Sequence, residues 1–238
     1  MSRCTRYRII MKDGQAVDID EKTIADITDW SRVQELQISC ASTLPKNVLQ
    51  YIEQTPGTSI SLICCELNHP LDCSKVNALI INYCRFPDIK FNPYADSIGC
   101  KNYYGSEKPT LSDNARKTTY DVSNVKKLTL RNIKFRAGDK LLTNPYAEEI
   151  DLFCTTLPSG EYNFCGVKDL DLIGTTYEPG AKLTLTKEQN EEFRDIFERC
   201  RLIRKAPQVE IKDVSDANAE YKKQKSILSQ QVIPPYTK

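Results

Sequence analysis

Apolar residues recur along the chain in one fixed order. Each copy begins with an apolar residue, and two more apolar residues follow three and five positions after it. A small or apolar residue lies eight positions after the first residue, and another apolar residue lies ten positions after it. Clear copies begin at Gly57, Val76, Val125, Ala147 and Val167, a further copy begins with Val33, Leu36 and Ile38, and a candidate last copy comprises Ala206, Val209, Ile211 and Val214. From Val33 to Val167, neighbouring copies lie 19 to 24 residues apart except between Val76 and Val125, which indicates a repeat protein.

The centre of each copy has the period of a β-strand. Leu128 and Leu130 flank a polar residue, and so do Leu170 and Leu172. One short strand cannot bury its inward face alone, whereas stacked copies form a parallel sheet over a continuous core. The pattern therefore predicts an α/β solenoid over residues 31–214, with a short-stranded parallel sheet.

These copies resemble the leucine-rich-repeat family, whose consensus has the same spacing and an Asn or Cys at its ninth position. No copy has the usual Asn there; the residues at that position are Cys65, Cys84, Ile133, Thr155 and Thr175. With cysteine at this position, the copies are more similar to the intracellular, cysteine-containing classes of leucine-rich repeat than to the secreted classes. The resemblance implies a scaffold or adaptor that binds proteins, and the missing Asn leaves the curvature of the solenoid open.

An ordinary parallel α/β sheet or an all-β arrangement is the alternative fold. A parallel α/β sheet needs a helix of about ten or more residues between consecutive strands. Only 17 residues separate Leu152 from Leu170, and they include Pro158 and Gly166. This spacing favours the solenoid.

Both ends of the repeat region have the pattern of caps. Residues 1–30 predict a hairpin, turning at Asp13-Gly14, and then a short helix with Asp20 as its N-cap. A helix is expected over residues 45–54, on the outer side of the first coil, and a C-terminal helix over residues 186–203 with a capping box.

Two stretches interrupt the rhythm of the copies. Residues 92–121 are rich in Asn, Ser, Tyr, Lys and Gly, and we interpret them as a degenerate repeat with a long inserted loop. Residues 215–238 form a polar tail that ends in Pro234-Pro235-Tyr236-Thr237-Lys238. Loop and tail are each as compatible with a functional role as with a simple flexible segment.

Composition narrows the class of partner. The 33 Lys and Arg residues nearly cancel the 32 Asp and Glu residues, so bulk charge favours neither nucleic acid nor an anionic membrane as partner. No apolar run approaches a membrane span or a signal peptide, which predicts a cytoplasmic protein. In that compartment we expect most of the ten cysteines to be reduced and buried in the core.

The residue types needed for chemistry are sparse. His69 is the single histidine, so most Ser-His and Cys-His mechanisms have no base. Cys64, Cys65, Cys73 and Cys84 lie near His69 in sequence, but their spacing matches no zinc knuckle. Since the chain also has no glycine-rich phosphate loop, we expect no enzyme activity, no cofactor and no metal.

Residues between the inward strand positions define a candidate binding surface. On a solenoid they lie on the concave sheet face, where apolar groups rimmed by charge are typical of protein-binding patches. The hypothesis is a protein-binding site, centred on Phe153, that consists of Ile63, Ile80, Tyr83, Lys127, Arg131, Glu149, Asp151, Phe153, Asp171 and Ile173. The alternatives are cross-strand pairs that only stabilise the sheet, a self-associating subunit of a larger assembly such as a viral particle, and an enzyme of unrecognised type.

Overall fold

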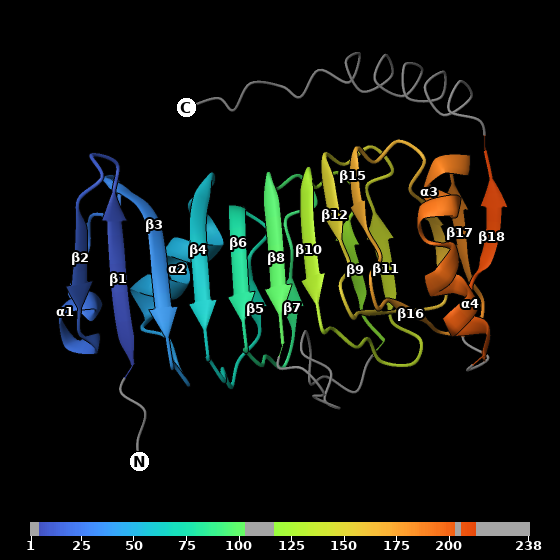
Figure 1. Ribbon diagram of the computed structural model, residues 1–238. Coiled ribbons are helices and arrows are strands. Elements are labelled where there is room, and N and C mark those ends of the chain that lie inside the picture. The colour runs from blue at the N-terminus through green and yellow to red at the C-terminus, as the bar shows by residue number, and fades with distance from the viewer. Residues whose placement is uncertain (1–4, 103–116, 203–205, 213–238) are drawn as a thin grey trace.

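A computed structural model describes residues 5–102, 117–202 and 206–212, and these wind into stacked coils (Figure 1). Nine strands form one large sheet in the order β15-β12-β10-β8-β6-β4-β3-β1-β2. Its parallel strands are β3 (Val33–Ser39), β4 (Thr58–Ile63), β6 (Val76–Asn82), β8 (Ser97–Lys101), β10 (Lys127–Arg131), β12 (Glu149–Asp151) and β15 (Asp169–Asp171). The predicted solenoid with a parallel sheet is therefore confirmed.

The second apolar position of every copy lies in one row across the coils. Backbone pairing aligns Leu36, Ile60, Leu79, Ile98, Leu128, Ile150 and Leu170. All of them are buried except Leu170, which is half-buried in the last coil. A side-chain row of this kind is what a continuous core requires of stacked coils, since each coil buries its inward face against its neighbours.

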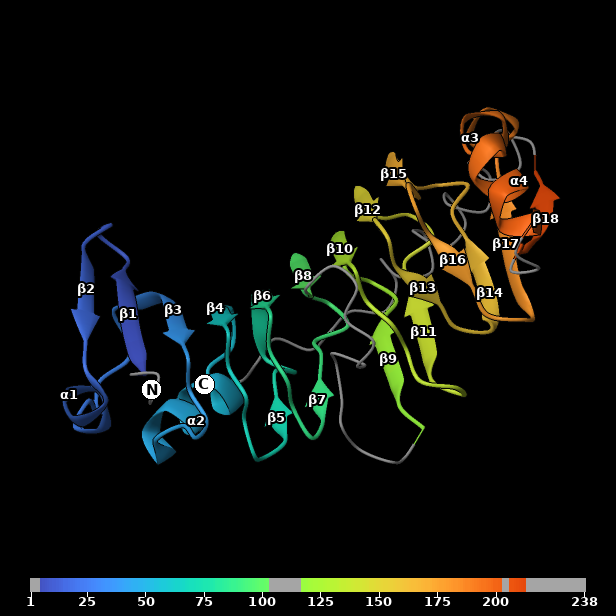
Figure 2. The same ribbon diagram turned by 60° about the horizontal axis from the view of Figure 1, so that its bottom comes forward.

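The far side of the coils is made mostly of short strands. The strands of this layer are β5 (Leu71–Asp72), β7 (Ile89–Lys90), β9 (Thr119–Val122), β11 (Lys140–Thr143), β14 (Gly160–Asn163), β17 (Ala181–Leu185) and β18 (Gln208–Ile211), and between the two layers lie β13 (Thr156–Leu157) and β16 (Thr176–Tyr177). Figure 2 shows the two layers from a tilted view. The solenoid is therefore β-helix-like where we expected α/β coils, because the return segments are too short for helices.

The N-terminal end of the sheet is covered as expected. Strands β1 (Arg6–Met11) and β2 (Ala16–Ile19) pair in an antiparallel hairpin, and β1 also pairs antiparallel with β3. Helix α1 (Glu21–Ala25) begins after Asp20, whose carboxylate accepts the Thr23 N–H at 2.7 Å. The hairpin thus ends the run of parallel strands on this side.

Helices occupy two further positions. Helix α2 (Lys46–Gln54) lies behind the first coil and buries Val48 and Ile52. After β17 the chain forms α3 (Lys187–Glu192) and α4 (Arg194–Leu202), and Thr186 and Gln189 form the expected capping box. The single helix predicted over residues 186–203 is therefore two short helices, which meet at Phe193.

The two stretches that interrupt the rhythm of the copies, and the candidate last copy, have different outcomes. Residues 92–102 form a coil that contains β8, which confirms the degenerate repeat expected within residues 92–121; residues 103–116 lie outside the described residues. The prediction of a last repeat copy that begins at Ala206 was wrong. Strand β18 pairs with β17 in the back layer and adds no strand to the large sheet. The tail over residues 215–238 also lies outside the described residues.

Threonine performs at the coil corners the role for which the consensus uses Asn. The Thr155 hydroxyl donates to the Leu130 carbonyl at 2.7 Å, and the Thr175 hydroxyl donates to the Leu152 carbonyl at 2.8 Å. Both threonines are buried, so each bond satisfies a backbone acceptor of the preceding coil that water cannot reach. The missing Asn therefore does not interrupt the stacking.

Most described cysteines belong to the core, as expected. Cys65, Cys73, Cys84, Cys100, Cys165 and Cys200 are buried. Burial raises the pKa of Cys100 to about 12, so its thiol stays protonated at neutral pH. Cys40, Cys64 and Cys154 are half-buried and free. In the described part of the chain, no helix is long and apolar enough to cross a membrane.

Candidate functional site

The ten predicted binding residues lie on the outer face of the large sheet or at its edge. Seven of them lie within strands, namely Ile63, Ile80, Lys127, Arg131, Glu149, Asp151 and Asp171. Tyr83, Phe153 and Ile173 come just after the ends of β6, β12 and β15. Neighbouring strands thus bring these residues onto one surface.

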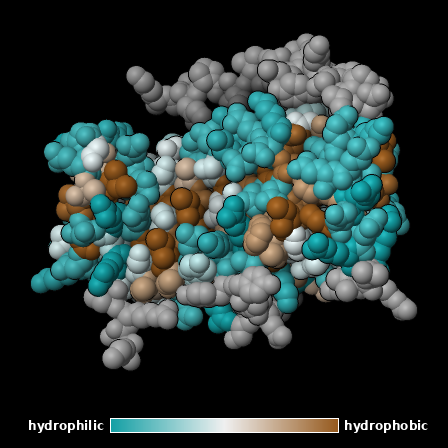
Figure 3. All heavy atoms as spheres, in the orientation of Figure 1, coloured by the Kyte–Doolittle hydropathy of each residue, from teal (hydrophilic) through white to brown (hydrophobic). Residues whose placement is uncertain are grey.

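Strand β8 divides this surface into two groups. Ile80 on β6 pairs with Gly99 on β8, and Gly99 pairs with Thr129 on β10. Ile63, Ile80 and Tyr83 consequently lie apart from the group on β10, β12 and β15. Figure 3, which views this face, shows apolar side chains in separate patches among hydrophilic ones. A single site centred on Phe153 does not describe this arrangement.

The second group is organised around a buried carboxylate. The Asp151 side chain is 7% exposed, and its Oδ2 accepts from both Nε (2.7 Å) and Nη2 of Arg131. Its Oδ1 accepts the Phe153 N–H at 3.0 Å. The hydrogen bonding between the Arg131 and Asp151 side chains raises the pKa of the Arg131 guanidinium, which therefore keeps its charge.

Phe153 belongs to the same cluster of interacting side chains. The Arg131 guanidinium carbon lies 6.0 Å from the centroid of its ring, at the limit of a cation–π contact. Phe153 is half-buried, so it offers a partner less apolar surface than the sequence suggested. The large exposed apolar side chain of this group is Ile173, which is 54% exposed.

Carboxylates accumulate toward the β15 end of the sheet. Glu149 pairs with Lys127 on one side and with Asp169 on the other, and Asp171 is the register partner of Asp151. Since Arg131 is bonded to Asp151, the side chains of Asp169 and Asp171 leave this end acidic. Asp169 was absent from the predicted set, although its alternation with Asp171 was visible in the sequence.

A small apolar groove lies beside Ile173. Its volume is about 230 Å³, and it is lined by Gly174, Thr175, Thr176, Ile196, Arg199 and Cys200. The groove runs between the coil corner and helix α4. Sequence reasoning missed it because only the fold brings α4 against residues 174–176, although the shared helix face of Ile196 and Cys200 was a signal.

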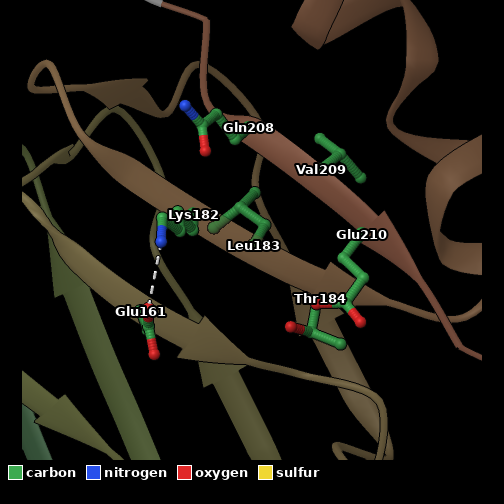
Figure 4. A pocket seen from close by; sticks show the side chains of 7 residues that line it. All are labelled: Glu161, Lys182, Leu183, Thr184, Gln208, Val209 and Glu210. Atoms are coloured by element: carbon green, nitrogen blue, oxygen red, sulfur yellow. Dashed lines mark hydrogen bonds and ion pairs between the residues drawn. The ribbon is translucent and has the colours of Figure 1, made fainter.

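A second hollow of about 370 Å³ lies over the back layer at the C-terminal end. It is lined by Glu161, Lys182, Leu183, Thr184, Gln208, Val209 and Glu210 (Figure 4). Lys182 and Glu161 form an ion pair across neighbouring strands at 3.2 Å.

The groups considered for catalysis and metal binding are dispersed. The Nδ1 of His69 lies 3.0 Å from the Pro70 carbonyl oxygen, in the turn between β4 and β5. Cys64 and Cys65 follow the end of β4, where Cys64 is half-buried and Cys65 is buried. Within residues 5–102, 117–202 and 206–212, no group of three or more His, Cys, Asp or Glu side chains could hold a metal ion.

Comparison with known proteins gives no relative for this chain: no family model, no curated protein and no solved structure matches it. The leucine-rich-repeat resemblance therefore rests on the spacing of apolar residues alone.

Proposed function

We propose that the chain is a non-catalytic protein-binding module, a scaffold or adaptor, whose contact surface is the outer face of β10, β12 and β15 with the groove beside α4. We name this surface the β15 surface; its binding residues are Glu149, Asp169, Asp171, Ile173 and Ile196. The partner is a protein segment with an apolar side chain flanked by lysines or arginines. The observation that carries the proposal is Ile173, which is 54% exposed just after the carboxylates of Asp169 and Asp171.

Charge supports a basic partner. Two cations of this face, Lys127 and Arg131, stand beside the four carboxylates of Glu149, Asp151, Asp169 and Asp171. Arg131 is bonded to Asp151, Lys127 is the register partner of Glu149, and Arg199 lines the adjoining groove, so the acidic excess lies at Asp169 and Asp171. Complementary charge accelerates encounter and suppresses wrong partners, even where it adds little affinity.

Shape supports an apolar anchor. Ile173 immediately precedes Gly174, which lines the groove, so the exposed side chain and the groove are continuous along the chain. Interfaces derive most of their binding energy from a few buried apolar or aromatic anchors surrounded by a polar rim. One aliphatic or aromatic side chain of a partner, seated against Ile173, would have this arrangement.

Ile173→Glu is expected to weaken binding of such a segment at least tenfold, because it replaces the apolar contact with a charge. The probe is the peptide consensus recovered by panning a random peptide library on the full chain, with affinity measured by fluorescence anisotropy. We expect a consensus with one apolar residue between basic ones, and an affinity that falls as salt rises.

Leu142→Glu is the matched control. Leu142 is 45% exposed but lies on β11 in the back layer, so the same change there should leave peptide affinity unaltered. Equal binding by the Ile173→Glu variant would refute the β15 surface, and failure to enrich any basic peptide would refute the proposed partner class.

A second candidate function, a subunit of a larger assembly, is favoured by strand β18. Among the described residues β18 pairs only with β17, and its Ile211 is 54% exposed. An edge strand of this kind can pair with another copy. Size-exclusion chromatography with light scattering tests this candidate: association that grows with concentration and disappears in Ile211→Lys supports it, and a monomer at all concentrations contradicts it.

A further inference from the structure

One row of coil corners has a left-handed backbone. Cys40, Cys64, Tyr83, Asn132 and Cys154 all have φ between 52° and 60°, and Gly174 ends the row at 69°. Each residue lies four positions after the aligned core residue of its coil, so we call this set the corner row. The row has one member in each of the coils of β3, β4, β6, β10, β12 and β15, and it stacks along the solenoid.

Backbone hydrogen bonds fix the spacing of the corner row. The Cys40 N–H donates to the Ile63 carbonyl at 2.9 Å, and the Cys64 N–H donates to the Asn82 carbonyl at 2.8 Å. Ser39 and Ile63, which precede the two cysteines, are register partners. Cys40 and Cys64 are therefore direct neighbours, one coil apart.

Side chains of the corner row reach along the stack. The Sγ of Cys154 lies 2.7 Å from the position that a Cβ would occupy on Gly174, its neighbour in the next coil. In the other direction, the Asn132 amide donates to the carbonyl of Asn102 in the preceding coil at 3.4 Å. A thiol in this row can therefore approach the Cβ of the residue one coil away.

Cys40 and Cys64 have this relation to each other, with a thiol on each side. Neighbouring strands of a sheet lie about 4.8 Å apart, within the Cα separation of about 4.4–6.8 Å that a disulfide needs. Both thiols are free and half-buried, whereas Cys65, the next residue, is buried. Among the described cysteines, these two are therefore placed both for pairing and for access from solvent.

We propose that Cys40 and Cys64 form a redox-active dithiol that a hydroperoxide converts into an intramolecular disulfide. One thiolate attacks the outer peroxide oxygen, the O–O bond breaks, and a sulfenic acid and an alcohol (water, for hydrogen peroxide) result. The second thiol attacks the sulfenic sulfur, the S–O bond breaks and water leaves. Two thiols and one hydroperoxide thus give one disulfide, one alcohol and one water.

The disulfide would tie together the coil that carries α2. Residues 40 and 64 bracket helix α2 and the whole of β4, so the bond closes a loop around them. Closing this loop restricts the unfolded chain, and the oxidised protein is expected to have the higher Tm. The inference is independent of the β15 surface.

The test is stoichiometric hydrogen peroxide on the full chain, followed by non-reducing peptide mass spectrometry. We expect a cross-link between Cys40 and Cys64 that dithiothreitol reverses, and that is absent in Cys40→Ser and Cys64→Ser. Cys154→Ser, a half-buried corner-row cysteine elsewhere, should retain the cross-link. Sulfinic or sulfonic acid on Cys40 or Cys64 in place of the cross-link would overturn the proposal.

Gly174→Cys tests the geometry without touching either cysteine of the pair. It places a thiol beside Cys154 on the same row, so peroxide should now also link residues 154 and 174. A cross-link in this variant without one between Cys40 and Cys64 would limit the geometry to the C-terminal coils and refute the dithiol. Absence of both cross-links would refute the corner-row argument itself.

Discussion

Gly166→Ala is expected to lower the free energy of unfolding by about 3 kcal/mol. A Cβ on Gly166 would overlap the ring of Tyr146 and lie 2.7 Å from the Pro145 carbonyl oxygen. Backbone cannot move aside as a flexible side chain can, so the turn before β15 would have to separate from the turn before β12. Urea unfolding followed by circular dichroism measures the loss.

Gly99→Ala is the control for this substitution. The nearest atom to a Cβ on Gly99 is the Leu79 carbonyl oxygen, 3.9 Å away, which is an ordinary contact. Glycine in a strand interior costs roughly 0.5–1 kcal/mol relative to Ala, so this variant should be neutral or slightly more stable. If the two variants lost equal stability, the close packing of Tyr146 on Gly166 would be wrong.

The large sheet could be predicted because its inward positions are decided by burial alone. Leu128 and Leu130 repeat in every coil as Leu, Ile or Cys, since only compact apolar side chains fill the row. Strand period and coil length then follow from the same residues. The hairpin and the capping box were predictable for a similar reason, because turn and cap chemistry is local.

A short motif marks the degenerate repeat at residues 92–121, where the apolar positions alone are a weak signal. Asn-Pro-Tyr-Ala occurs at residues 92–95 and again at residues 144–147, each time just before a strand. In both copies the Asn amide donates to a carbonyl of the preceding coil, Val76 or Val125, at 3.0 Å. This motif identifies the turn before a strand even where the apolar positions are weak, as in β8.

The back layer could not be predicted from periodicity. Strands β5 and β7 have two residues each, too short for an alternating pattern to be recognised. They form because stacking places equivalent backbone segments side by side, which is a property of the solenoid and not of either segment. The prediction of α/β coils was wrong because it did not anticipate these short strands of the back layer.

The sequence predicted which face of the sheet carries the candidate site, but not which apolar side chain of that face is the more exposed. The sequence placed Phe153 on the correct face, yet its exposure depends on Arg131 from the neighbouring coil, which covers its ring. Ile173 is exposed because it follows β15, which among the described strands lies at the end of the large sheet, beside β12. Such differences arise from cross-coil contacts, which a single copy of the repeat does not contain.

Leu128→Ala is expected to cost about 3–4 kcal/mol in free energy of unfolding. Leu128 is 2% exposed and lies in register between Ile98 and Ile150, so the cavity would open at two coil interfaces at once. In a stacked protein each coil is held mainly by its two neighbours, so a defect at both interfaces weakens most of the packing of this coil. Urea unfolding of the variant and the parent gives the difference.

Leu142→Ala separates the effect of the row from that of losing any leucine. Leu142 is 45% exposed on β11, so its truncation should cost less than about 1 kcal/mol. A loss for Leu128→Ala no greater than this would contradict the alignment of the core row. A lower slope with urea, or two separate transitions, would instead show that the coils on either side of β10 unfold independently once their shared interface is weakened.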